Sequence, residues 1–171
     1  VLHMLRGRMG GTLTDAWRLL KSSVWFGSMM VEMGDADGII GGISRDYPEF
    51  LKPCLATIGM SEDAHRVVGT YMMTIKGQLM FISDATINIY PDARTLAEIA
   101  VQTARVARRF GIEPRVALLP FSNFGSSSQY RSERIEDSLE MAKELDPTLI
   151  IDGPMQADTA LVPSIQEQYP F

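Results

Sequence analysis

The chain has 171 residues, which is enough for one hydrophobic core or for one domain and part of another. Hydrophobic residues make up 46% and charged residues 22% of it, a globular rather than a disordered composition. The net charge of −5 argues against general nucleic-acid binding.

Neither a membrane segment nor a metal centre is predicted. No apolar run reaches about 18 residues and no signal peptide is recognisable, so we expect a cytoplasmic protein without a membrane partner. Cys54 is the single cysteine, which excludes an intrachain disulfide and fits a reducing compartment. His3 and His65 stand apart from any cluster of metal ligands, so we expect no metal in this domain.

The first third of the chain predicts helices and one strand. Thr14–Leu20 and Val24–Met33 have helical patterns, and Gly34 follows as a C-terminal cap. Ala36–Gly41 reads as a short apolar strand that ends in glycines. Pro48–Ile58 predicts a helix with proline in its first turn.

The middle of the chain predicts a β-hairpin and then a long helix. Arg66–Ile75 and Leu79–Ile82 are rich in β-branched and large apolar residues, and Lys76-Gly77-Gln78 between them indicates a hairpin turn. Asp92–Phe110 predicts a single helix that ends before Gly111. Its apolar residues recur at helical spacing and are expected to be buried: Leu96, Ile99, Ala100, Thr103, Val106, Ala107 and Phe110.

The last third predicts a βαβ unit. The apolar run Val116–Leu119 is typical of a buried parallel strand, and a loop rich in Ser, Asn and Gly follows it. The helical segment Gln129–Leu145 leads to a second strand within Thr148–Ile151. Met155–Gln168 predicts a helix interrupted by Pro163. We therefore expect an α/β fold whose parallel sheet includes Ala36–Gly41, Val116–Leu119 and Leu149–Ile151, with helices on both faces.

Three loops would lie at the carboxyl ends of these strands, where ligands bind in such sheets. They are Gly41–Arg45, Ser122–Ser128 and Asp152–Asp158. Glycine and serine hydroxyls before a helix suit an anion such as phosphate, although an ordinary well-capped βα loop has the same composition. Asp152 and Asp158 could bind or orient a ligand, but acidic side chains in an acidic protein are usually solvated.

Basic residues gather in two places within this acidic chain. One cluster holds Arg6, Arg8, Arg18 and Lys21, and the other holds Arg105, Arg108, Arg109 and Arg115. Solvated helix faces account for both, and a local anion-binding patch is the alternative.

Four segments carry a family resemblance, in order and over nearly the whole chain. GDADGIIGG (34–42), YPDARTLAEIA (90–100), VALLPFSNFGSSS (116–128) and IDGPMQADTAL (151–161) resemble the phosphate acetyl/butyryltransferase family. The resemblance implies a phosphotransacetylase or isocitrate-dehydrogenase-like fold, of which this chain is a fragment. Residues 1–60 would be the C-terminal part of a first subdomain, and residues 61–171 a second α/β subdomain with an incomplete C-terminus.

Three details are similar to the C-terminal domain of multidomain NADP-dependent malic enzymes: SNFGSS, FISDATINIYP (81–91) and the final YPF. That resemblance implies a regulatory domain that binds acetyl-CoA and supports a homo-oligomer such as a dimer. No cofactor is expected in this domain, whereas NADP and a divalent metal would belong to another domain of the parent enzyme. A working phosphate acetyltransferase is the alternative, and a purely structural oligomerisation module with a vestigial cleft is the third reading.

The resemblance also assigns site residues. Those expected to bind acyl-CoA or phosphate are Arg6, Lys52, Ser122, Asn123, Gly125, Ser126, Ser127, Asp152 and Asp158. No catalytic residue is assigned, because the family's catalytic Ser-Arg pair belongs to a motif that this sequence does not contain. Three departures remove polar side chains that the family usually has: Gly41 replaces Ser or Cys, Pro120 replaces Ser and Pro154 replaces Glu.

Overall fold

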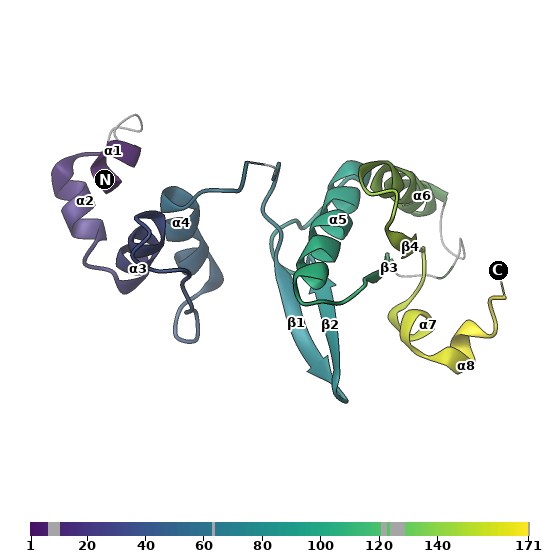
Figure 1. Cartoon of the computed structure of the whole chain (residues 1–171). Coiled ribbons are helices and arrows are strands. Elements are labelled where there is room, and N and C mark those ends of the chain that lie inside the picture. The colour runs from purple at the N-terminus through teal and green to yellow at the C-terminus, as the bar shows by residue number, and fades with distance from the viewer. Residues whose placement is uncertain (7–10, 63, 121–122, 124–128, 171) are drawn as a thin grey trace. The chain divides into compact units, whose positions relative to one another are not determined.

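The computed structural model describes the chain except residues 7–10, 63, 121–122, 124–128 and 171. The chain forms two compact units, Val1–Val67 and Val68–Phe171 (Figure 1). In the described residues no helix combines the length and the apolar character that crossing a membrane requires.

The first unit is helical. It contains α1 (Leu2–Arg6), α2 (Leu13–Leu19), α3 (Ser23–Glu32) and α4 (Tyr47–Thr57). The predicted helices α2, α3 and α4 are confirmed. Its small core consists of Leu2, Ala16, Trp25 and Met29. Gly34 ends α3 as predicted: it has φ of 77°, and the N–H of Asp35 donates to the carbonyl of Met30 at 2.8 Å, which satisfies an end carbonyl of the helix.

The predicted strand Ala36–Gly41 is wrong, because these residues form no strand. A strand exists only where a second strand takes up its backbone hydrogen bonds, and no described segment pairs with this one. Ile40 and Ile43 are fully exposed. The side chain of Ile39 instead packs on α3. A Cβ added to Gly27 of that helix would lie 2.9 Å from Cδ1 of Ile39.

The second unit begins with the predicted hairpin, which is confirmed. β1 (Thr70–Ile75) and β2 (Gln78–Ser83) pair antiparallel, with Thr70 opposite Ser83 and Ile75 opposite Gln78. Lys76 and Gly77 form the two-residue turn with φ of 50° and 80°, the conformation that suits the twist of paired strands.

Two long helices carry most of the core of the second unit. α5 (Ala93–Arg109) begins at Asp92, whose carboxylate accepts the N–H of Thr95 at 2.7 Å, and α6 (Gln129–Leu145) packs against it (Figure 1). The buried face of α5 is made largely of small residues: Ala97, Ala100, Val101, Ala104 and Ala107. Small side chains let two helices approach closely, so the packing selects this face of α5.

The prediction that Phe110 is buried is therefore wrong. Phe110 is 55% exposed, and the centroid of its ring lies 5.7 Å from that of Phe81 in the hairpin. Leu96, Thr103 and Val106 are half-buried, whereas Ile99, Ala100 and Ala107 are buried as predicted.

The predicted βαβ unit is present. β3 (Arg115–Ala117) pairs parallel with β4 (Ile150–Asp152), and α6 connects the two strands. Leu118, Ile135, Leu149 and Ile151 join the alanines of α5 in one buried cluster. α7 (Ala157–Leu161) and α8 (Pro163–Gln166) follow, separated by Val162 where Pro163 was expected to interrupt the helix. In the part of the chain described, the fold is thus α/β but mostly helical, and its parallel sheet has two strands rather than three.

Candidate functional site

The candidate site lies where β3 and β4 end on the same edge of the parallel pair. Beyond the strands, the N–H of Leu118 donates to the carbonyl of Asp152 at 2.9 Å. The N–H of Met155 donates back to the carbonyl of Leu118 at 3.2 Å. These hydrogen bonds hold the turn after β4 directly against the backbone after β3.

Gly153 makes this close approach feasible. It has φ of 148°, and a Cβ built on it would lie 2.8 Å from the carbonyl oxygen of Leu118. Any other residue would push the two backbones apart.

A second connection lies further out and joins Asn123 to Gln156. The N–H of Gln156 donates to Oδ1 of Asn123 at 2.5 Å, and Nδ2 of Asn123 donates to Oε1 of Gln156 at 3.2 Å. We call this two-bond contact the Asn123–Gln156 clasp. Gln156 is the residue immediately before α7, so the clasp ties the loop after β3 to the start of that helix.

The two predicted acidic residues, Asp152 and Asp158, lie before and after Gln156 in the sequence. Asp152 is exposed at the end of β4, and its Oδ1 accepts the N–H of Gly153 at 2.8 Å. Asp158 is exposed in the first turn of α7 and accepts the N–H of Thr159 at 2.8 Å. Within the described residues neither carboxylate forms an ion pair.

The other predicted residues divide into two groups. Ser122, Gly125, Ser126 and Ser127 lie outside the described residues. The remaining two belong to the first unit. Arg6 is the last residue of α1, and its side chain is not among those that the structure describes. Lys52 is exposed on α4.

The loop Gly41–Arg45 was expected at the end of a parallel strand, and that expectation is wrong because no strand precedes it. Gly41 nevertheless has a specific environment. A Cβ added there would lie 2.4 Å from Cε2 of Phe50 in α4, so the phenyl ring occupies the space that a side chain at position 41 would need.

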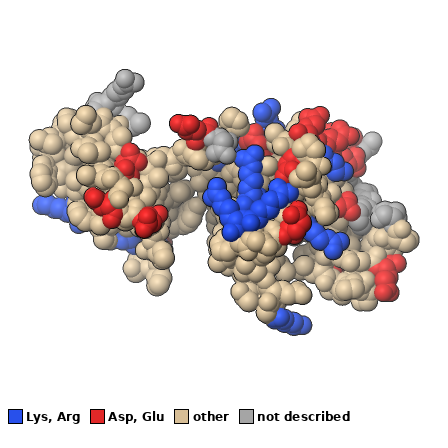
Figure 2. All heavy atoms as spheres, viewed as in Figure 1, with Lys and Arg blue, Asp and Glu red and all other residues tan. Residues whose placement is uncertain are grey.

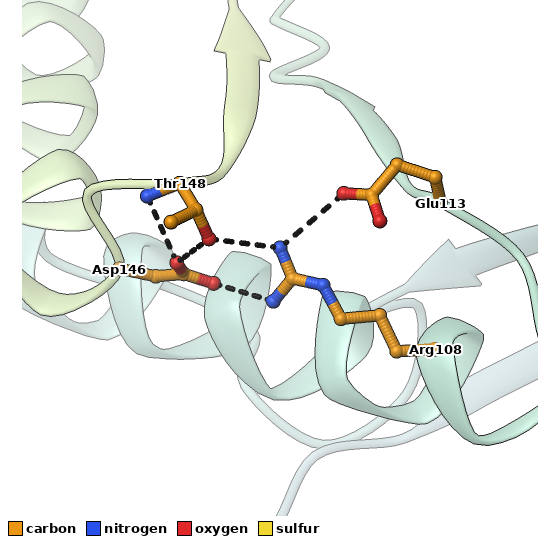
Figure 3. Close-up of polar contacts among 4 residues, drawn as sticks. All are labelled: Arg108, Glu113, Asp146 and Thr148. Carbon is orange, nitrogen blue, oxygen red and sulfur yellow. Dashed lines mark hydrogen bonds and ion pairs between the residues drawn. The ribbon is translucent and has the colours of Figure 1, made fainter.

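The basic cluster on α5 is exposed only in part. Figure 2 shows basic side chains gathered over α5 and acidic side chains over α6. Arg108, however, is engaged: Nη1 donates to Oδ2 of Asp146 at 2.6 Å, and Nη2 lies 3.6 Å from Glu113 and 3.5 Å from Oγ1 of Thr148 (Figure 3). The Arg108 hydrogen bond, followed by that from Thr148, holds the pKa of Asp146 below its ordinary range.

Arg108 is therefore a structural tie rather than part of an anion-binding patch. It joins the last turn of α5 to the segment between α6 and β4. This network lies at the strand starts, the opposite edge from Asn123 and Gln156. Arg105, Arg109 and Arg115 are exposed.

Gln156 was not predicted as a site residue. Its side chain is one of many exposed amides, and only the fold places it opposite Asn123. Gly153-Pro154 just before it was the available signal, since such a pair marks a tight turn at the strand end. No group of three or more potential metal ligands occurs among the described residues.

Two parallel strands joined through a helix define a βαβ unit, and with it an α/β domain. The chain belongs to the phosphate acetyl/butaryl transferase family, whose profile matches residues 1–170. It is 38% identical to the phosphate acetyltransferase of Bacillus subtilis over 92% of its length, and 40% identical to the NADP-dependent malic enzyme of Escherichia coli over 93%. Among solved structures, a phosphotransacetylase from Streptococcus pyogenes matches 95% of the chain with a TM-score of 0.81 and 35% identity.

The chain is therefore a phosphotransacetylase-like domain. It spans 49% of the Bacillus subtilis enzyme, 21% of the Escherichia coli malic enzyme and 50% of the Streptococcus pyogenes structure. The two kinds of relative match at similar identity, so identity does not distinguish between them.

Proposed function

We propose that this chain is the regulatory domain of an NADP-dependent malic enzyme, that it binds acetyl-CoA, and that it supports a homo-oligomer. Similarity to the Escherichia coli malic enzyme supports a malic enzyme as the parent protein. NADP and a divalent metal would then be bound by another domain of that enzyme. The polar edge formed by the ends of β3 and β4 supports a ligand site in this domain.

The observation that favours binding without catalysis is the contact between Gly41 and Phe50. The family resemblance places a Ser or Cys at position 41, and here the Phe50 ring fills that space. Pro120 and Pro154 likewise provide no polar side chain where the family resemblance places Ser and Glu, and Pro154 is buried. A transferase must stabilise the charge that develops on the carbonyl and phosphate oxygens, and each missing polar group weakens that capacity.

Binding needs less. Acetyl-CoA carries phosphate groups that require cations and N–H donors. Asp152 and Asp158 are negative, so positive charge must come from elsewhere, and the resemblance assigns it to Arg6 and Lys52. In this proposal Ser122, Gly125, Ser126 and Ser127 supply hydroxyl and N–H donors next to Asn123.

A thermal-shift titration of the full-length protein with acetyl-CoA tests the site. A ligand that binds only the folded state stabilises it by about 2.7 kcal/mol at a hundredfold excess over its dissociation constant. We expect a rise in melting temperature for the wild type and a smaller rise for Arg6→Ala and for Ser126→Ala. Matched controls are Arg109→Ala and Ser164→Ala, both exposed and in other segments, which should shift as the wild type does.

The outcomes separate the candidate functions. If Arg6→Ala and Ser126→Ala shift as much as the wild type, the site is elsewhere. If acetyl-CoA binds but leaves malate oxidation unchanged, the regulatory role is wrong and a structural module replaces it.

The second candidate is a phosphate acetyltransferase, favoured by the Bacillus subtilis relative and the Streptococcus pyogenes structure. In that reaction the thiolate of CoA attacks the carbonyl carbon of acetyl phosphate, a C–S bond forms, and the C–O bond to phosphate breaks. Turnover of acetyl phosphate and CoA at about one per second or faster, an ordinary enzyme rate, would establish this candidate.

A further inference from the structure

We draw no further inference here: the strongest candidate, the exposed apolar patch that Tyr71, Met73, Ile75 and Ile82 form on one face of the β1–β2 hairpin, carries none because nothing in the structure shows what covers it.

Discussion

At the scale of single residues, Gly153 shows how strictly the end of β4 is specified. Its φ of 148° is unfavourable for other residues, and its α-carbon faces the carbonyl of Leu118 with no room for a methyl group. We expect Gly153→Ala to destabilise the protein by ~2 kcal/mol or more, because strain and steric overlap add. Chemical denaturation measures this. The control Gly38→Ala has no neighbour within 4 Å of the new methyl group and should change stability little.

An equal loss of stability in Gly153→Ala and Gly38→Ala would contradict the steric argument. The same comparison bears on the site, since Gly153→Ala should also weaken the contact between Leu118 and Met155.

The candidate site residues were predictable to different degrees. Asp152 and the loop around Asn123 followed from two apolar runs that end in polar residues, a pattern typical of parallel strands and the loops at their carboxyl ends. Gln156 did not follow, because its partner lies 33 residues earlier in the chain. Local pattern carries no information on such a pairing.

At the scale of elements, the turn between β2 and α5 is organised by one carboxylate. Asp84 accepts the N–H groups of Thr86, Ile87 and Asn88, each at 3.0 Å, and also the side-chain amide of Asn88. Burial by itself would raise the pKa of Asp84, but these hydrogen bonds outweigh it and hold the pKa below its ordinary value.

We expect Asp84→Asn to lower the free energy of unfolding by ~1–2 kcal/mol at neutral pH, because an amide cannot accept all four hydrogen bonds. The lowered pKa makes this contribution pH-dependent. It is fully present above the unfolded-state pKa of about 3.9 and is lost as the pH falls through the lower folded-state pKa. Urea unfolding of both proteins between about pH 7 and pH 3 should therefore show a difference that shrinks below about pH 4.

Asp37→Asn, at an exposed position of the first unit, is the control and should show no such difference. If the difference in free energy of unfolding between wild type and Asp84→Asn grows on acidification, the lowered pKa of Asp84 is not its cause.

Elements with complete local signals were predicted well. The hairpin had a turn sequence between two β-type runs, and α5 had a capping aspartate and a terminal glycine. Ala36–Gly41 had an apolar run only. Its pairing depends on a partner strand, which no short segment can specify, and the prediction was wrong.

At the scale of the whole molecule, the two units have separate cores. Leu149 is buried in the second unit with 5% exposure, and Leu149→Ala should cost ~2–5 kcal/mol through lost burial and a residual cavity. If each unit unfolds on its own, hydrogen exchange should become faster in α5 and α6 and stay unchanged in α3 and α4. Leu161→Ala, at an exposed position in α7, is the control. Faster exchange in α3 and α4 as well would show that the units unfold together.

The sequence by itself determined the family, the helices with capping residues, the hairpin and the order of the βαβ unit. These depend on residue types at short spacing: Asp92 before α5, Gly111 after it, and apolar runs at β3 and β4. Tertiary structure alone decided that Phe110 is exposed and that Ala97, Val101 and Ala104 belong to the buried face of α5, because close packing on α6 favours small residues. It also decided that Ala36–Gly41 stays outside any described sheet and that Asn123 meets Gln156. Each of these outcomes depends on contacts between segments that are distant in sequence, where the free energy of packing and pairing overrides local preference.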